Sequence, residues 1–190
     1  MEQEQEKEEL MLLSIMGEDR PGLTASIMAV LAKYNVHVQD IGQADIHSSL
    51  SLGILIRVEE PNSGKVMKEV LFKATELNVT VRFVPISLEQ YEAWVGRQGK
   101  NRYMLTVLGR RLEARQIGAV AQLIAEQGLN IDAIIRLSGR SSLVHPMEKT
   151  RACIEFSVRG TPKDKNELHA ALLKMSSEME IDCSFQRDNM

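Results

Sequence analysis

The chain has 190 residues, of which 44% are hydrophobic and 26% charged, a composition typical of a globular protein with a buried core. Its formal net charge is −3 and no segment concentrates basic residues, which argues against a nucleic-acid-binding protein. No apolar run approaches the roughly 20 residues of a membrane span, and the N-terminal segment has no signal-peptide pattern. We therefore expect a cytoplasmic protein that binds neither nucleic acid nor membrane.

The first half of the chain, after a Glu- and Gln-rich tail over residues 1–9, alternates between strand-like and helix-like segments. Strands are predicted wherever apolar residues alternate with other residues, at 11–15, 36–38, 50–58 and 79–83. An apolar residue at every third or fourth position predicts helices at 23–31 and 66–77. The segment Pro61–Gly64 is interpreted as a break before the second helix. The predicted order of elements over 10–85 is βαββαβ.

The linker between the halves, residues 86–101, is predicted to form a helix. Ser87 and Gln90 have the spacing of a capping box, and the following apolar residues lie on one helical stripe. We interpret it as a packed linker helix. The alternative is a hinge that senses an effector.

The second half repeats the same order over 102–187. Strands are predicted at 103–107, 129–131, 152–158 and 181–185, and helices at 117–124 and 168–175. Thr161 followed by Pro162 predicts the start of the last helix, with Thr161 as its N-cap. Gly109 follows Gly17 by 92 residues, close to half the chain, which indicates duplication of one domain.

A βαββαβ order produces an antiparallel four-stranded sheet with both helices on one face. The predicted fold class is therefore α+β, with two ferredoxin-like domains at 10–85 and 102–187. Each sheet leaves one face and one edge uncovered. Because exposed edges tend to be paired or protected, we expect at least a homodimer.

The turn after the first strand, Gly17–Thr24, carries the clearest chemical signal. Pro21 lacks an amide hydrogen and suits a first helical turn, while Gly22 would let a ligand approach the backbone. Free amides at a helix N-terminus form a cradle for a carboxylate. Asp19 could accept hydrogen bonds from an α-ammonium group, so one turn would hold both charges of a free amino acid. The alternative is that Asp19 only caps the helix.

This turn, read as Gly-Glu-Asp-Arg-Pro-Gly-Leu-Thr within a βαββαβ pattern, resembles that of ACT domains, the amino-acid-sensing modules of metabolic enzymes. The resemblance implies a ligand between two paired domains, held by the first turn of one and the start of the second strand of the other. Carried over by position, the candidate ligand-binding residues are Gly17, Asp19, Pro21, Gly22, Leu23, His37, Asp40, Gly109, Arg110, Asn130 and Asp132.

The two copies differ at these positions. Asn130 falls where the resemblance places an amino-acid-binding asparagine, although it could equally stabilise the turn after Gly128. His37 stands at the matching place in the first copy. The segment after Gly109 has no Pro-Gly pair, so the second copy has either a weaker site or only the surface that partners the first.

The second copy narrows the resemblance to the regulatory half of two-ACT phosphoserine phosphatases, through the segments VLGRRLEARQIGAVAQLIAEQGLNIDAIIRLSGR, ACIEFSVRGTPKD and SFQRDNM. In that family a haloacid-dehalogenase-type catalytic domain follows, with an Asp-x-Asp nucleophile motif and Mg²⁺. Asp-x-Asp does not occur in this chain. We therefore expect a regulatory fragment, or a protein that has lost its catalytic half, with no phosphatase activity and no cofactor of its own.

Three functions compete. The first is a regulatory module that binds a small amino-acid effector, serine or glycine. The second is a stand-alone double-ACT regulator of a transcription factor, of the glycine-cleavage repressor type. The third is an enzyme, but the four histidines have no metal-ligand or triad spacing. Cys153 and Cys183 form no CxxC pair and are expected to be reduced thiols, with Cys183 on the core face. We favour the first function.

Overall fold

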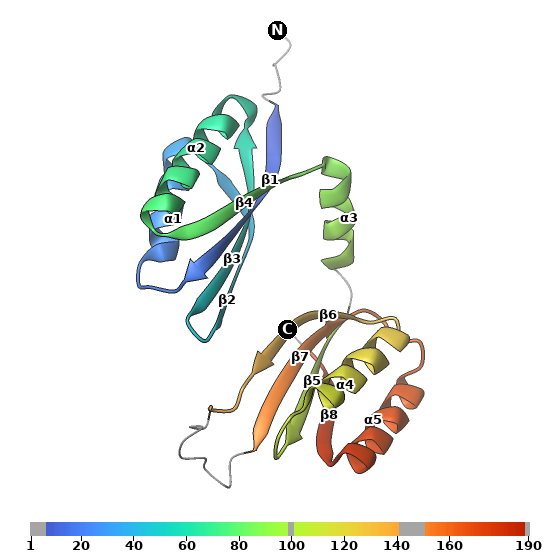
Figure 1. Cartoon of the computed structure of the whole chain (residues 1–190). Helices are drawn as coiled ribbons and strands as arrows, with labels where there is room; N and C mark the ends of the chain where they lie inside the picture. The colour runs from blue at the N-terminus through green and yellow to red at the C-terminus, as the bar shows by residue number, and fades with distance from the viewer. Residues whose placement is uncertain (1–6, 99–100, 141–150, 189–190) are drawn as a thin grey trace. The chain divides into compact units, whose positions relative to one another are not determined.

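The structure is a computed structural model that describes residues 7–98, 101–140 and 151–188. It divides into two compact units, unit 1 over residues 1–96 and unit 2 over residues 97–190 (Figure 1). Each unit has its own hydrophobic core, and each is described separately below.

Unit 1 has the order β-α-β-β-α-β followed by a helix. Its elements are β1 (Glu8–Glu18), α1 (Leu23–Leu31), a 3₁₀ turn (Ala32–Tyr34), β2 (His37–Ile46), β3 (Ser49–Glu59), α2 (Glu60–Glu76), β4 (Val79–Ile86) and α3 (Leu88–Gln98). The first strand thus begins at Glu8, inside the segment that the sequence assigned to the tail. Residues 1–6 of that segment lie outside the described residues.

Unit 2 repeats this order. Its elements are β5 (Arg102–Gly109), α4 (Ala114–Glu126), β6 (Asn130–Arg136), β7 (Ala152–Arg159), α5 (Lys165–Met179) and β8 (Ile181–Arg187).

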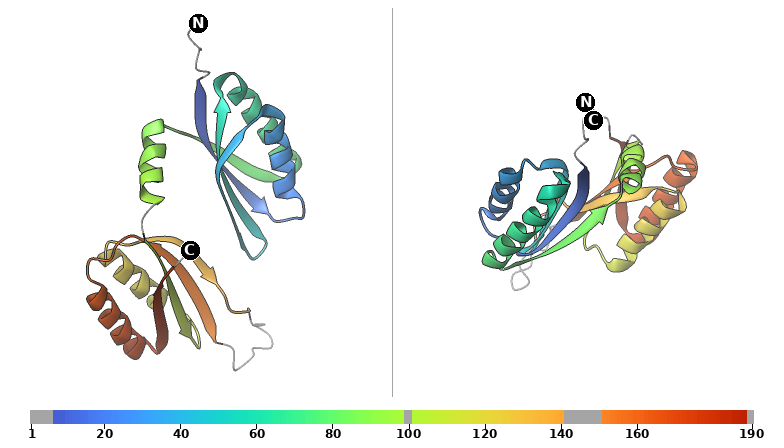
Figure 2. Two further views of the ribbon diagram at one scale, coloured as in Figure 1. Left: turned by 180° about the vertical axis from the view of Figure 1, so that it is seen from behind. Right: turned by 90° about the horizontal axis from the view of Figure 1, so that it is seen from above.

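Both units contain a four-stranded antiparallel sheet, in the order β2-β3-β1-β4 in unit 1 and β6-β7-β5-β8 in unit 2. The two helices that alternate with the strands lie on one face of each sheet (Figures 1 and 2). The predicted α+β class with two ferredoxin-like units is confirmed.

The two cores follow directly from the alternation of apolar residues. In β3 the side chains of Leu50, Leu52, Ile54, Ile56 and Val58 are at most 2% exposed and face α1 and α2. In unit 2, Phe156 of β7 pairs with Leu105 as Ile54 pairs with Leu13 in unit 1. Phe156 is completely buried among residues of β5, α4 and α5. Cys183 packs against this core as predicted, and its burial raises the pKa of its thiol.

Helix α3 begins with the predicted capping box. The Ser87 amide donates to Oε1 of Gln90 at 2.9 Å, and the Gln90 amide donates to Oγ of Ser87 at 3.1 Å. The helix has no fully buried residue. It is fastened to the sheet of unit 1 by Tyr91, whose hydroxyl donates to Oε1 of Gln39 at 3.1 Å.

Two helices begin elsewhere than the sequence indicated. Pro61 lies in the first turn of α2, which starts at Glu60, so Pro61–Gly64 belongs to the helix and does not break the chain before it. Proline is well suited to this place because the amide it lacks would have no partner there. Helix α5 starts at Lys165 with Asp164 as its N-cap, three residues later than predicted from Thr161.

Asp164 stabilises the start of α5 with two hydrogen bonds. Its Oδ1 accepts from the amides of Asn166 at 2.7 Å and Glu167 at 3.1 Å. We expect Asp164→Ala to lower the free energy of unfolding of unit 2 by about 1 kcal/mol, because both amides lose their acceptor. Urea denaturation followed by circular dichroism would measure it. Thr161→Ala is the control, and an equal loss from both variants would contradict the assignment of the cap.

Candidate functional site

The turn between β1 and α1 has a definite geometry that explains its Pro-Gly pair. The Leu23 amide donates to the Arg20 carbonyl at 3.3 Å, and Gly22 has φ 84° and ψ 0°. These values are those of the third residue of a type II turn, where a positive φ favours glycine and proline suits the preceding position. Pro21 therefore belongs to the turn, and not to the first turn of α1 as the sequence suggested.

The amides that follow this turn are available to a ligand. Within the part of the chain that the structure describes, the amides of Gly22, Thr24 and Ala25 donate to no backbone carbonyl or side chain. A Cβ atom built on Gly22 would meet nothing within 4 Å, so the space beside it is open. The predicted amide cradle at the start of α1 is present, and it suits a carboxylate.

Asp19 lies beside the cradle without acting as its cap. Its amide donates to the Ser48 carbonyl at 2.8 Å, which fastens the turn to the hairpin between β2 and β3. The N-cap position is Gly22, and no side chain caps the helix. The exposed Asp19 carboxylate has no hydrogen bond or ion pair with any described residue. The helix-cap alternative for Asp19 is thus contradicted by the structure.

Gly17 has a different role from the rest of the turn. It pairs with Val79 of β4, and a Cβ on Gly17 would lie 2.6 Å from Cγ1 of Val79. Its lack of a side chain is required by strand packing, whatever binds at the turn. Leu23 is buried in the core of unit 1, and its amide already donates to the Arg20 carbonyl, so it adds no free donor to the cradle.

The start of the second strand lies at the far end of the same sheet. His37 pairs with Arg57, which pairs with Leu10, whereas the turn follows Glu18. The eight positions from Leu10 to Glu18 span about 26 Å in an extended strand. One unit therefore does not bring His37 or Asp40 together with Asp19, and a site that uses both ends needs a second domain.

Unit 2 has a polar cluster at the start of its second strand. Nδ2 of Asn130 donates to Oδ1 of Asp132 at 3.0 Å, and Nη2 of Arg159 lies 2.6 Å from the same oxygen. The Arg159 side chain is only 16% exposed, and its Nη1 is buried with no hydrogen-bond partner. The cluster therefore holds an unused cationic donor beside Asn130.

The strand register shows how the two copies correspond here. Both second strands carry a bulge, between Val38 and Asp40 in unit 1 and between Ile131 and Ala133 in unit 2. Asp132 therefore corresponds to Gln39, while His37 corresponds to Asn130. Asp40 uses its Oδ1 to accept from the neighbouring Ile41 amide at 3.0 Å.

Two arginines at this end were not found from the sequence. Arg57 faces His37 in unit 1 as Arg159 faces Asn130 in unit 2. Arg57 pairs with Glu8, and its Nε is buried with no partner. The signal that could have revealed them is an arginine at the same place in the third strand of both copies.

The first turn of unit 2 has no open cradle. Helix α4 begins with a capping box between Glu113 and Gln116, so a side chain already occupies an amide at its start. Arg110 lines a pocket of about 590 Å³ beside this turn, together with further charged residues of both signs. The segment after Gly109 has no Pro-Gly pair, and its turn accordingly differs from the turn between β1 and α1.

Comparisons with known proteins agree with this geometry. A family model described as an ACT domain matches residues 9–84, and a second ACT-domain model matches residues 102–186. This chain belongs to the ACT-domain family. ACT domains are regulatory modules that bind amino acids, so the resemblance inferred from the Gly17–Thr24 turn is confirmed for both copies.

One relative is the phosphoserine phosphatase of Streptomyces coelicolor, 32% identical over 178 residues that make up 90% of this chain. The chain spans 38% of the length of that relative. Among solved structures, an unknown protein from Galdieria sulphuraria has a TM-score of 0.76 at 15% identity, covering 96% of this chain and 99% of that one. A putative glycine cleavage system transcriptional repressor has a TM-score of 0.68 at 11% identity, covering 95% and 98%. At these identities the two structures show a shared fold alone.

The described residues contain no group of three or more His, Cys, Asp or Glu side chains placed to hold a metal ion. None of the helices in that part of the chain is long and apolar enough to cross a membrane.

Proposed function

We propose that this chain is an amino-acid-sensing regulatory module that binds L-serine, with glycine as the next candidate. The observation that carries the proposal is the open amide cradle at Gly22, with the exposed carboxylate of Asp19, which has no partner among the described residues, three residues earlier in the same turn. The amides would hold the α-carboxylate of the ligand and Asp19 its α-ammonium group.

The second half of the site would come from another ACT domain. The start of a second strand carries Asn130 beside Arg159 in unit 2, or His37 beside Arg57 in unit 1. Because these residues lie at the opposite end of their own sheet from the turn, paired domains in opposed orientation would place the two halves together. This supports a homodimer or a pair of domains within one chain.

The regulated activity is proposed from the phosphoserine phosphatase relative. The identity of 32% to a phosphoserine phosphatase supports a role in a protein of that kind, where serine is the product of the named reaction. The likeness to a glycine cleavage repressor rests on the fold alone, at 11% identity, and does not favour the second function.

Asp19→Ala tests the proposal directly. We expect the affinity for L-serine to fall by about tenfold or more, because the variant removes a charged acceptor worth about 1.5–3 kcal/mol. Isothermal titration of the whole chain with L-serine, glycine and D-serine measures it. Stability should stay unchanged, because Asp19 does not cap α1.

Glu18→Ala is the matched control, since it removes the same charge one position earlier and should preserve serine binding. D-serine should bind more weakly than L-serine, because with both charges held in place its side chain leaves the α-carbon in a different direction. Absence of serine binding to the wild-type chain, or equal affinity of the wild type and Asp19→Ala, would overturn the proposal. A substitution at Gly22 is a poor test, because its positive φ strains any other residue.

A further inference from the structure

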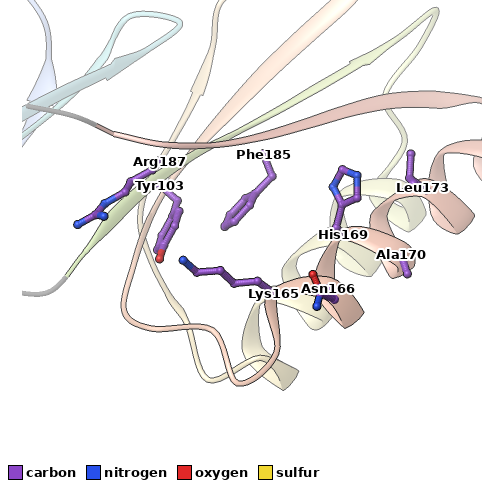
Figure 3. Close-up of a pocket in the computed structure, with 8 residues that line it drawn as sticks. All are labelled: Tyr103, Lys165, Asn166, His169, Ala170, Leu173, Phe185 and Arg187. Carbon is purple, nitrogen blue, oxygen red and sulfur yellow. The ribbon is translucent and has the colours of Figure 1, made fainter.

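Unit 2 contains a groove that does not belong to the proposed serine site. It lies between α5 and β8, on the helix-bearing side of the sheet, and has a volume of about 560 Å³, within the range of small-molecule sites (Figure 3). It is lined by Tyr103, Lys165, Asn166, His169, Ala170, Leu173, Phe185 and Arg187.

The feature that points to a ligand is an unused hydroxyl group. Tyr103 is only 3% exposed, and its hydroxyl is buried with no hydrogen-bond partner. A buried polar group left without a partner costs about 1–3 kcal/mol, so such a group in a folded protein calls for an explanation. In Figure 3 the hydroxyl lies at the same end of the groove as the Lys165 ammonium group.

The duplication shows that the fold does not require this hydroxyl. Tyr103 pairs with Arg187 at the position where Met11 pairs with Pro85 in unit 1. Met11 is 5% exposed, so an apolar side chain fills the same place without a polar atom. Unit 2 thus carries a phenol and a guanidinium group where unit 1 has two apolar residues.

The facing helix differs between the units in the same way. The buried pairs Val66 and Val70 of α2 and Leu168 and Leu172 of α5 have the same spacing, which places His169 where unit 1 has Met67. Met67 packs against the core of its unit, whereas His169 is exposed. Unit 2 thus has an exposed imidazole beside the groove where unit 1 has an apolar side chain that packs against the core.

The charges and rings of the lining define the ligand class. Lys165 and Arg187 supply two positive charges, and the lining contains no acidic residue. Arg187 donates from Nη2 to Oδ1 of Asn101 at 2.7 Å, which holds its guanidinium group in place. The rings of Tyr103 and Phe185 are stacked with centroids 4.8 Å apart, and in Figure 3 Phe185 lies between Tyr103 and His169. A flat apolar body would lie against the partly exposed Phe185 ring, and an anionic group would meet the two cations.

We propose that this groove binds a small planar organic anion, a carboxylate or a phosphate ester. The exposed Lys165 side chain moves aside and forms an ion pair with the anionic group of the ligand. The Tyr103 hydroxyl, which has no partner in this structure, then donates a hydrogen bond to the same group. The proposal does not depend on serine binding at the Asp19 turn, which lies in unit 1.

The proposal is tested by titrating the whole chain with phenyl phosphate, benzoate, inorganic phosphate and phenol. Binding is monitored through the NMR signals of the aromatic rings. We expect saturable binding of phenyl phosphate or benzoate, at least about tenfold tighter than the binding of inorganic phosphate or phenol. Only the first two probes carry both an aromatic ring and an anionic group. The tighter of the two identifies the anionic group. No saturable binding of either, or equal binding of all four probes, would overturn the proposal.

Three variants locate the binding. Tyr103→Phe keeps the ring and should weaken binding of the better probe by about tenfold, while the melting temperature stays the same or rises because a buried unpaired hydroxyl is removed. Lys165→Ala should weaken it similarly. Lys174→Ala is the control: this lysine lies on the same helix, pairs with Glu178 and does not line the groove. Full affinity in Tyr103→Phe, or an equal loss in Lys174→Ala, would overturn the assignment to this groove.

Discussion

Replacing Phe156 with alanine is expected to lower the free energy of unfolding of unit 2 by about 3–5 kcal/mol. Phe156 is completely buried and lies in β7 between β5 and β6, under α4 and α5. Its removal leaves a cavity that the surrounding strands cannot close, because their hydrogen-bonded register holds them apart. A loss of this size is a large fraction of the stability of a small domain.

Because the two cores are separate, the effect should be confined to unit 2. The single tryptophan, Trp94, lies in α3 within unit 1, so its fluorescence reports unit 1 while circular dichroism reports both. In urea, Phe156→Ala should split the dichroism transition in two and leave the fluorescence transition in place. Leu13 is also completely buried, but in unit 1. Leu13→Ala should therefore move the fluorescence transition to a lower urea concentration and leave the unfolding of unit 2 in place. If Phe156→Ala shifted both probes together, the two units would unfold as one.

Gly17→Val should destabilise unit 1 by about 3 kcal/mol, at the upper end of the usual cost of overpacking. A Cβ at this position would lie 2.6 Å from Cγ1, 3.0 Å from Cβ and 3.2 Å from Cα of Val79. The Val79 side chain is β-branched and stiff, and its backbone is held in the β1–β4 ladder, so neither can move aside without breaking strand pairing.

The double variant Gly17→Ala with Val79→Ala shows whether this contact is the cause. Removing Cγ1 should recover part of the stability lost in Gly17→Ala alone, but not all of it, since the Cβ and Cα of residue 79 remain close. The free energies of unfolding of the four proteins form a mutant cycle. Strict additivity in that cycle would show that the cost of a side chain at Gly17 has another origin.

Several elements were predictable from local patterns. The alternation from Leu50 to Val58 placed β3 because successive side chains of a strand point to opposite faces. The spacing of Ser87 and Gln90 placed the start of α3 because both partners of a capping box lie within one turn. The start of α5 was missed because Thr161-Pro162 carries the same local signal as Asp164. In the structure the amides of Lys163 and Asp164 donate to Gln127, which is distant in the sequence, and the helix starts after them.

The candidate site was predictable only in part. The Pro-Gly turn is a local signal, since its φ values depend on the residues themselves, and it pointed correctly to an open cradle. Arg57 and Arg159 were missed because their role depends on strand register, in which each faces the start of the second strand. Asp132 and Gln39 lie 93 residues apart, the same offset as Asn130 and His37, because the bulge falls at the same place in both second strands.

By itself, the sequence determined that the chain forms two βαββαβ units, because strand and helix periodicities depend on neighbouring residues. Only the tertiary structure decided which distant residues meet. Sheet pairing places His37 and Asp19 at opposite ends of unit 1. It also brings Tyr103, Lys165 and Arg187 together around one groove. Such contacts join residues far apart in the chain through hydrogen bonds between strands and packing between layers, and no local spacing encodes them.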